Sequence, residues 1–228
     1  MKRILLITLV LSTSLLLITS HFTYLKAQNQ DFGSWTGIEI NKKLSQRLSV
    51  SFTEELRLKE NITQLNSFFS EAGVGYKFSQ YLKVAANYRF NQKQRIDQSL
   101  GTRHRFNVDF AFQNKINAFV VSYRMRVQSQ LNDYYSSETG KVPNYNLRHK
   151  FSLEWDLDNR ISPLAAAELF YPINQMDNKL QQVRLNAGIK YDINNDNRII
   201  INYLVQKETY VNNPLTEHVI GLTYQLSF

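Results

Sequence analysis

Residues 217–228, which read Glu-His-Val-Ile-Gly-Leu-Thr-Tyr-Gln-Leu-Ser-Phe, carry the pattern that decides the fold. From Ile220 to Phe228 every even position is apolar or aromatic, whereas the odd positions are small or polar. Successive side chains of a β-strand point to opposite faces, so a period of two predicts a strand with one apolar and one polar face. The segment is therefore expected to separate two very different environments.

The same alternation recurs along the chain. Ten segments show it, near residues 47–58, 71–78, 82–90, 103–112, 119–128, 147–155, 165–171, 183–191, 199–206 and 217–228. Many of them alternate for about 9–11 residues, the length of a tilted strand that crosses a bilayer, whereas strands of soluble proteins average about 5–6 residues. No comparable stretch has a helical period. The chain is therefore predicted to be all-β.

The connections between these segments alternate in length. Short turns are expected near residues 45–46, 79–80, 114–117, 158–160 and 194–197, and longer polar loops near residues 61–63, 92–100, 132–143, 173–178 and 211–214. Short turns at one end and long loops at the other are typical of outer-membrane barrels. Together with the strand lengths, they favour a transmembrane antiparallel up-and-down β-barrel of about 10–12 strands in a bacterial outer membrane.

A soluble alternative fits the same period. A secreted periplasmic β-sandwich binding protein also has alternating strands, with the apolar face turned towards a protein core. Beyond the N-terminal region the chain has no apolar segment near 20 residues, so it is not expected to span a membrane as helices. Its mean hydropathy of −0.37 suits a barrel, because only alternate residues of a barrel strand meet lipid.

The N-terminal region has the layout of a secretory signal peptide. A basic pair at residues 2–3 precedes an almost uncharged apolar run over residues 4–18, and cleavage is expected after Ala27, within a few residues. A retained membrane helix is the alternative, but the run is short for about 30 Å of hydrocarbon. The expected organisation is a signal peptide, residues 1–27, followed by a single barrel domain, residues 28–228.

Composition and motifs exclude several kinds of site. The chain has no cysteine, which rules out disulfides, thiolate metal sites and a lipidated N-terminal cysteine. The formal net charge of +8 falls to +5 without Lys2, Arg3 and Lys26, and basic residues are interleaved with acidic ones instead of forming a nucleic-acid patch. Because phosphate-loop, metal-ligand and cofactor motifs are missing, we expect no catalytic residue, no cofactor, no metal and no nucleic-acid partner.

The last strand resembles the C-terminal signal that outer-membrane barrels present to their assembly machinery, an amphipathic strand that ends in Phe. The residues that carry this resemblance share one face of the strand: Leu222, Tyr224, Leu226 and Phe228. The resemblance implies three kinds of partner, which are the secretion machinery, the barrel-assembly machinery and outer-membrane lipid.

A set of short motifs points to one family. The motifs are Asp31-Phe32-Gly33-Ser34-Trp35-Thr36-Gly37, Lys42-Lys43-Leu44-Ser45, Glu54-Glu55-Leu56-Arg57, Tyr88-Arg89-Phe90 and Arg103-His104-Arg105-Phe106. Through them the whole mature chain resembles DUF2490, a family of small predicted outer-membrane barrels without assigned function. The resemblance implies location and architecture, and it carries over no catalytic residue.

An eleventh segment, from Phe32 to Lys43, raises a question of strand parity. Bacterial single-chain barrels have an even number of strands, with both termini periplasmic. Ten strands from Arg47 onward satisfy this rule. The remaining segment is then expected to be either an extra strand with an unrecognised partner, which would give twelve strands, or a segment in the lumen or at the barrel foot.

The polar faces of the strands converge inside such a barrel and supply a lumen-facing charged network. Its expected members are Glu55, Arg57, Glu71, Arg89, Arg103, Arg105, Asp109, Arg124, Arg126, Arg148, Lys150, Glu154, Glu168, Arg184 and Lys190. Interdigitated ion pairs would fill a small lumen and give the protein a structural role. The alternative is a narrow channel or porin whose excess of arginine favours small anions.

A lipid-modifying enzyme is a further alternative. Outer-membrane enzymes of this kind use a histidine as general base to a serine hydroxyl. Beyond the N-terminal region the only histidines are His104, His149 and His218, which are expected to face lipid beside aromatic side chains. Ser152 lies three residues from His149, hence on the opposite face of the strand. We therefore expect no enzyme.

Overall fold

The fold is known from a computed structural model that describes residues 29–95, 97–133, 142–157, 160–173 and 179–228. The expected signal peptide, residues 1–27, lies outside the described residues, as do parts of four expected connections, residues 96, 134–141, 158–159 and 174–178. The described part of the chain contains no helix that is long and apolar enough to cross a membrane.

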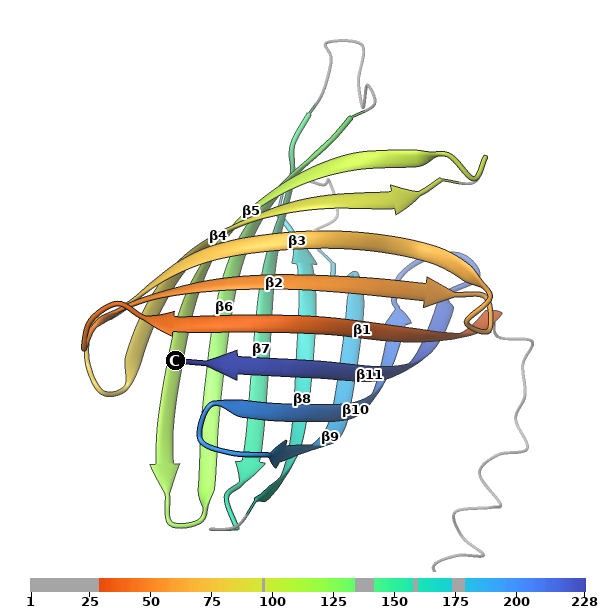
Figure 1. Ribbon diagram of the computed structural model, residues 1–228. Helices are drawn as coiled ribbons and strands as arrows, with labels where there is room; N and C mark the ends of the chain where they lie inside the picture. The colour runs from red at the N-terminus through yellow and green to blue at the C-terminus, as the bar shows by residue number, and fades with distance from the viewer. Residues whose placement is uncertain (1–28, 96, 134–141, 158–159, 174–178) are drawn as a thin grey trace, which may run out of the picture.

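Within the described residues, eleven strands close into one barrel (Figure 1). They are β1 (Asn29–Lys43), β2 (Leu48–Lys59), β3 (Gln64–Lys77), β4 (Leu82–Gln94), β5 (Leu100–Ile116), β6 (Phe119–Asn132), β7 (Asn144–Trp155), β8 (Ile161–Pro172), β9 (Gln182–Asp192), β10 (Asn197–Glu208) and β11 (Leu215–Ser227). The all-β barrel predicted from the alternation is confirmed. The two-sheet sandwich is wrong, because every strand is hydrogen-bonded to two neighbours within a single closed sheet.

The strand count lies within the expected range of ten to twelve, but the even parity is wrong. The segment from Phe32 to Lys43 belongs to β1, which pairs antiparallel with β2 and parallel with β11, from Asn29 opposite Leu215 to Asn41 opposite Ser227. It is therefore part of the wall, neither in the lumen nor at the foot, and no twelfth strand is needed. Because β1 pairs with both β2 and β11, no strand of the sheet has an open edge. In a ten-stranded barrel closed by β2 and β11, the backbone groups of β1 would be left unpaired.

The two ends of the barrel differ in their connections. At the end that we call the short-turn end, strands are joined by residues 44–47, 78–81, 117–118, 156–160 and 193–196; at the long-loop end, by residues 60–63, 95–99, 133–143, 173–181 and 209–214. The β2–β3 connection, expected to be long, is no longer than the turns at the other end. Because the strand number is odd, β1 begins at the long-loop end whereas β11 finishes at the short-turn end.

The strands are strongly staggered around the barrel. The register shows this stagger. Lys43 lies at the short-turn end of β1, and the series of directly paired residues that starts from it and passes through β2 to β9 ends at Glu208, at the long-loop end of β10. A closed sheet with such a stagger has strands tilted by roughly 35–45° to the barrel axis. Side chains at very different positions along their strands therefore meet at one level of the lumen.

The polarity of the two faces is reversed relative to a water-soluble domain. Among the described residues, the buried apolar side chains are Phe69, Leu204 and Val219. The outer face exposes large apolar side chains on every side, and Phe106, Leu185 and Ile201 are each more than half exposed. The interior instead buries polar and charged side chains, which include Asn107, Asp109, Arg126, Gln128, Arg148 and Glu168.

Gly188 in β9 is required by the close approach of β10. A Cβ at this position would lie 2.5 Å from the carbonyl oxygen of Ile201 and 2.7 Å from Cβ of Asn202. Because one of these atoms is backbone, Gly188→Ala is expected to force the two strands apart and to cost about 1–3 kcal/mol in urea unfolding from detergent micelles. Gly101→Ala is the matched control, since the atom nearest to its Cβ is Nε of the Arg95 side chain, which can move. Equal stabilities of the two variants would contradict the argument.

Candidate functional site

A cavity of about 730 Å³ occupies the half of the lumen nearer the long-loop end. Side chains close to that end of their strands line it, for example Lys93, Asn144 and Gln182. Inward side chains close to the short-turn end, such as Ser49 and Lys83, do not line this cavity. The cavity is therefore a chamber in the long-loop half of the lumen.

The chamber wall carries far more positive than negative charge. Ten cationic side chains line it: Arg57, Arg89, Lys93, Arg103, Arg105, Arg124, Arg126, Arg148, Lys150 and Arg184. The carboxylates in its lining are four: Glu39, Glu55, Glu71 and Glu168. A concave surface lined by one sign of charge concentrates ions of the opposite sign. The chamber is therefore built to attract anions.

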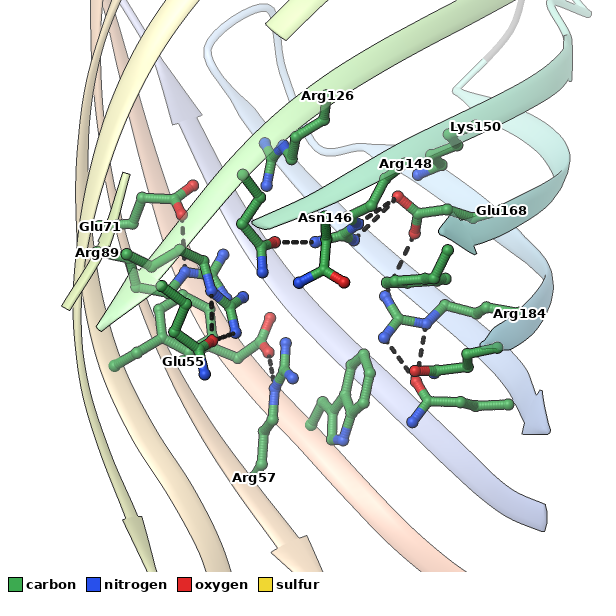
Figure 2. A pocket seen from close by; sticks show the side chains of 18 of the residues that line it. Glu55, Arg57, Glu71, Arg89, Arg126, Asn146, Arg148, Lys150, Glu168 and Arg184 are labelled. Carbon is green, nitrogen blue, oxygen red and sulfur yellow. Dashed lines mark hydrogen bonds and ion pairs between the residues drawn. The ribbon is translucent and has the colours of Figure 1, made fainter. Parts of the chain in front are cut away.

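Glu168 on β8 is the centre of the strongest ion-pair cluster. Its Oε1 accepts hydrogen bonds from Nη2 of Arg124 at 2.8 Å and from Nη2 of Arg148 at 2.9 Å. Its Oε2 accepts a bond from Nη1 of Arg184 at 3.4 Å. Figure 2 shows Glu168 facing Arg148 and Arg184, with Lys150 close by on the next strand. The Glu168 side chain is only 5% exposed, so one carboxylate holds three guanidinium groups with little help from water.

Two of the remaining chamber carboxylates are held by arginines. Arg89 Nε donates to Glu71 at 2.7 Å, and Arg57 Nε donates to Glu55 at 2.6 Å. The fourth, Glu39, accepts hydrogen bonds from the side-chain amides of Asn41 and Gln225. Two further ion pairs include residues outside the chamber lining. Arg126 binds Asp109 through two parallel hydrogen bonds of 2.5 and 2.6 Å, and Lys190 contacts Glu154. Such forked guanidinium–carboxylate contacts are the strongest of their kind.

Three aromatic rings inside the lumen alternate with guanidinium groups. Phe69 lies under Arg89, at 3.5 Å from the guanidinium carbon to the ring centroid, and Trp35 lies under Arg57 at 3.8 Å. The full series, which we call the stacked ladder, runs Arg89, Phe69, Arg57, Trp35, Arg184, Phe170, Arg148, with each neighbouring pair 3.5–5.2 Å apart. Stacking uses the faces of the guanidiniums and leaves their N–H edges for anions.

The structure brings most of the predicted lumen residues together. Twelve of the fifteen line the chamber: Glu55, Arg57, Glu71, Arg89, Arg103, Arg105, Arg124, Arg126, Arg148, Lys150, Glu168 and Arg184. The other three lie in ion pairs, Asp109 with Arg126, and Glu154 with Lys190. The predicted assembly residues Leu222, Tyr224 and Phe228 are exposed on the outer face, and Phe228 pairs with the backbone of β1 through Asn41 and Lys43. That they act as an assembly signal stays a prediction.

Sequence reasoning missed Lys93 and the three lumen aromatics. The signal for Phe69 was present, because it has the same parity as Glu71 and Gly73 on one strand and therefore shares their inward face. No such signal was present for Trp35, because the position of its strand in the barrel could not be predicted.

The three described histidines share one arrangement on the outer face. Tyr88, Tyr123 and Tyr203 each hydrogen-bond through the phenol oxygen to Nδ1 of a histidine on the next strand, at 2.8, 2.8 and 2.7 Å. The partners are His104, His149 and His218, in that order. Each histidine is thus paired with a phenol and not with a serine hydroxyl. Among the described residues there is no group of three or more His, Cys, Asp or Glu side chains that could hold a metal.

Asp133, just beyond β6, ties the β4–β5 loop to the rim of the barrel. Its carboxylate accepts hydrogen bonds from the Thr102 amide at 3.0 Å and the Arg95 guanidinium at 2.7 Å. The Thr102 amide bond first, and Arg95 after it, lower the pKa of Asp133 below its ordinary value of 3.8. A lowered carboxyl pKa stabilises the tie at neutral pH, and the tie is lost as pH falls through the lowered value.

Asp133→Asn is therefore expected to raise amide hydrogen exchange over residues 97–102 at neutral pH. In the wild type the same loosening is expected only below pH 3.8, once rates are corrected for intrinsic exchange. Asp156→Asn is the matched control, because Asp156 pairs with Lys115 at the opposite end of the barrel. Unchanged exchange in the Asp133 variant would show that the loop is held by other contacts.

Comparisons with known proteins bear on the family and the fold. A family model described as "Protein of unknown function (DUF2490)" matches residues 32–216. Among solved structures, the chain is similar to the translocator domain of the autotransporter NalP from Neisseria meningitidis. The two are 11% identical with a TM-score of 0.47, and the match covers 78% of this chain and 73% of that one. No curated protein matches the chain.

Proposed function

The chain belongs to the DUF2490 family, and from that premise we propose that it is an outer-membrane β-barrel whose cationic lumen admits small anions. The observation that carries the proposal is the chamber of about 730 Å³, with its ten cationic side chains against four carboxylates. A lumen that served only to be filled would need roughly balanced charges, because unpaired buried charge is costly.

The outer face supports the membrane part of the proposal. Side chains such as Phe151, Leu185 and Ile201 are 52–56% exposed, and they belong to an apolar surface that surrounds the barrel. Contiguous apolar surface far beyond a few hundred Å² is not stable in water, whereas lipid covers it at no cost. We place the short-turn end and Phe228 in the periplasm, with lipid and the export and assembly machineries as partners. The long loops and the start of β1 then face outward.

The location is tested by fractionation and solubility. The protein is expected in the outer-membrane fraction, with migration on gels that changes on heating, as folded barrels show. A chain that stays folded and dissolved in buffer without detergent would overturn the proposed location, and the lumen function with it.

Anion preference is tested in planar bilayers under a potassium chloride gradient. The expected result is a step conductance with a reversal potential of the sign for chloride over potassium, because fixed positive charge raises the local anion concentration. The conductance is expected to be small, because long charged side chains project from the wall into a lumen that only eleven strands enclose. Bilayers that stay electrically silent, or a preference for potassium, would contradict the proposal.

A structural barrel with a packed lumen is the second candidate. It is favoured by the inward ion pairs that tie neighbouring parts of the wall together, such as Arg126 with Asp109 and Lys190 with Glu154. Silent bilayers combined with high stability would favour it. We propose no enzymatic activity, because each described histidine is paired with a tyrosine phenol on the outer face and none with a serine hydroxyl.

A further inference from the structure

Three cations on adjacent strands stand apart from the ion-pair clusters. Lys93 lies on β4, whereas Arg103 and Arg105 lie two residues apart on β5 and so share its inward face. In the register, Lys93 is opposite Gly101 and Arg103 is opposite Asn91, which places the lysine diagonally beside Arg103. All three side chains line the chamber near the long-loop end.

None of the three has a carboxylate partner. Among the described residues, no acidic oxygen forms an ion pair with Lys93, Arg103 or Arg105 within 4.0 Å. Arg105 donates two hydrogen bonds to the neutral amide oxygen of Gln130, at 3.1 and 2.6 Å. The three side chains are half-buried, so bulk water screens their charges incompletely.

Lys93 lies within electrostatic reach of Glu217 on β11, but the two form no ion pair within 4.0 Å, and Glu217 accepts a hydrogen bond from Gln206. The acids nearest to the two arginines are already engaged elsewhere. Glu71, two strands from β5, accepts from Arg89 and from the amide of Asn107. Asp109, on the same strand as Arg105, accepts two hydrogen bonds from the guanidinium of Arg126. Neighbouring lysine and arginine charges without a fixed counter-charge repel one another, and an anion between them removes that repulsion. The wall thus provides three positive charges and leaves the negative charge to a ligand.

We propose that Lys93, Arg103 and Arg105 form a binding site for a phosphate group, either inorganic phosphate or the phosphate of a small monoester. The guanidinium of Arg103 or Arg105 can present two N–H groups to two oxygens of one phosphate, and Lys93 adds a point charge. A doubly charged anion gains more than chloride from three clustered cations. The chamber of about 730 Å³ has room for an organic group beside the phosphate.

This site deepens the proposed function and rests on it, because the ligand must enter the same lumen. The test uses the full-length mature protein in detergent and titrates it by calorimetry with inorganic phosphate, with glycerol phosphate and with chloride. The double variant Arg103→Gln/Arg105→Gln is compared with Arg47→Gln/Lys83→Gln, which removes two cations at the short-turn end, outside the chamber lining. Heat-dependent gel migration checks that every variant is folded.

The expected result is saturable phosphate binding that the Arg103/Arg105 variant weakens at least about tenfold, while the control stays within about twofold. Arg105→Lys keeps the positive charge but loses the paired N–H groups of the guanidinium, so it is expected to weaken phosphate binding by a smaller factor. If the double variant fails to fold, this single variant tests the phosphate site instead. Tighter binding of glycerol phosphate than of phosphate would identify the monoester as the ligand class, and the reverse order would identify the free ion.

Equal binding by wild type and variant, no phosphate binding at all, or chloride binding as tight as phosphate would each overturn the phosphate site. These outcomes are separable from a failure of the proposed function. A barrel that prefers chloride over potassium in bilayers yet binds no phosphate keeps its anion-selective lumen and loses only the site.

Discussion

Glu168→Gln is expected to destabilise the barrel by about 3–5 kcal/mol, the range found when one partner of a buried ion pair is removed. The amide keeps the shape of the carboxylate but carries no charge. Arg124, Arg148 and Arg184 then face one another around a neutral group, and the Arg148 side chain is only 9% exposed, so water cannot replace the lost charge. Urea unfolding from lipid vesicles or micelles, followed by gel migration, measures the loss.

Glu154→Gln is the matched control for this effect. Glu154 is also an inward carboxylate, but among the described residues it pairs with a single cation, Lys190, and its side chain is 23% exposed. The expected cost is no more than about 1 kcal/mol, typical of a solvated pair. If the two variants lose equal stability, the cluster around Glu168 does not act as a shared counter-charge, and the lumen tolerates more unpaired charge than we infer.

The faces of the strands were predictable from the sequence because the side-chain period of a strand is fixed at two. Once Phe106 and Val108 are assigned outward, Arg105 and Asn107 must point inward, whatever their partners are. The inward group was therefore recoverable residue by residue. The pairing within it was not, because it depends on the strand register, which places Arg124 and Glu168, 44 residues apart, both level with Lys150.

The place of β1 could not be predicted from its own residues. Its pattern, with glycines at 33 and 37 around Trp35, is irregular, and the even-number rule for bacterial barrels argued against an eleventh wall strand. What decides the outcome is the hydrogen-bonding demand of β1 itself. A barrel closed by β2 and β11 alone would leave the backbone groups of β1 unpaired, whereas its place between them pairs both of its edges.

The excess of cations in the chamber is likewise a property of the assembled barrel. The net charge of the sequence says that cations exceed acids, yet Lys43, Arg47 and Lys77 lie in or beside the short turns, away from the chamber. Only the closed sheet shows which cations share one cavity and which carboxylates are already taken. The anion hypothesis gained weight from that local imbalance, since a fully paired network would have favoured a purely structural lumen.

Phe69→Ala is expected to be the second most damaging substitution, with a cost of about 3–5 kcal/mol, typical of truncating a buried aromatic ring. Phe69 is 2% exposed and is the most buried aromatic of the described chain. Its ring lies 3.5 Å from the guanidinium of Arg89 and 5.2 Å from that of Arg57, so its removal leaves a cavity and frees one end of the stacked ladder. Phe69→Leu restores apolar volume without the stacking and is expected to recover more than half of the loss.

The neighbouring residue provides the control. Phe68 has the same side chain one position away on β3, but it faces outward and is 37% exposed. Lipid or detergent fills the space left by Phe68→Ala, so that variant loses only contact area, about 1–2 kcal/mol, and no internal cavity forms. Because the two variants differ only in which face of one strand is truncated, their order of stability tests the assignment of inside and outside. A larger loss at Phe68 than at Phe69 would mean that the apolar face is the protein interior, and the lumen, its charges and the anion hypothesis would have to be abandoned together.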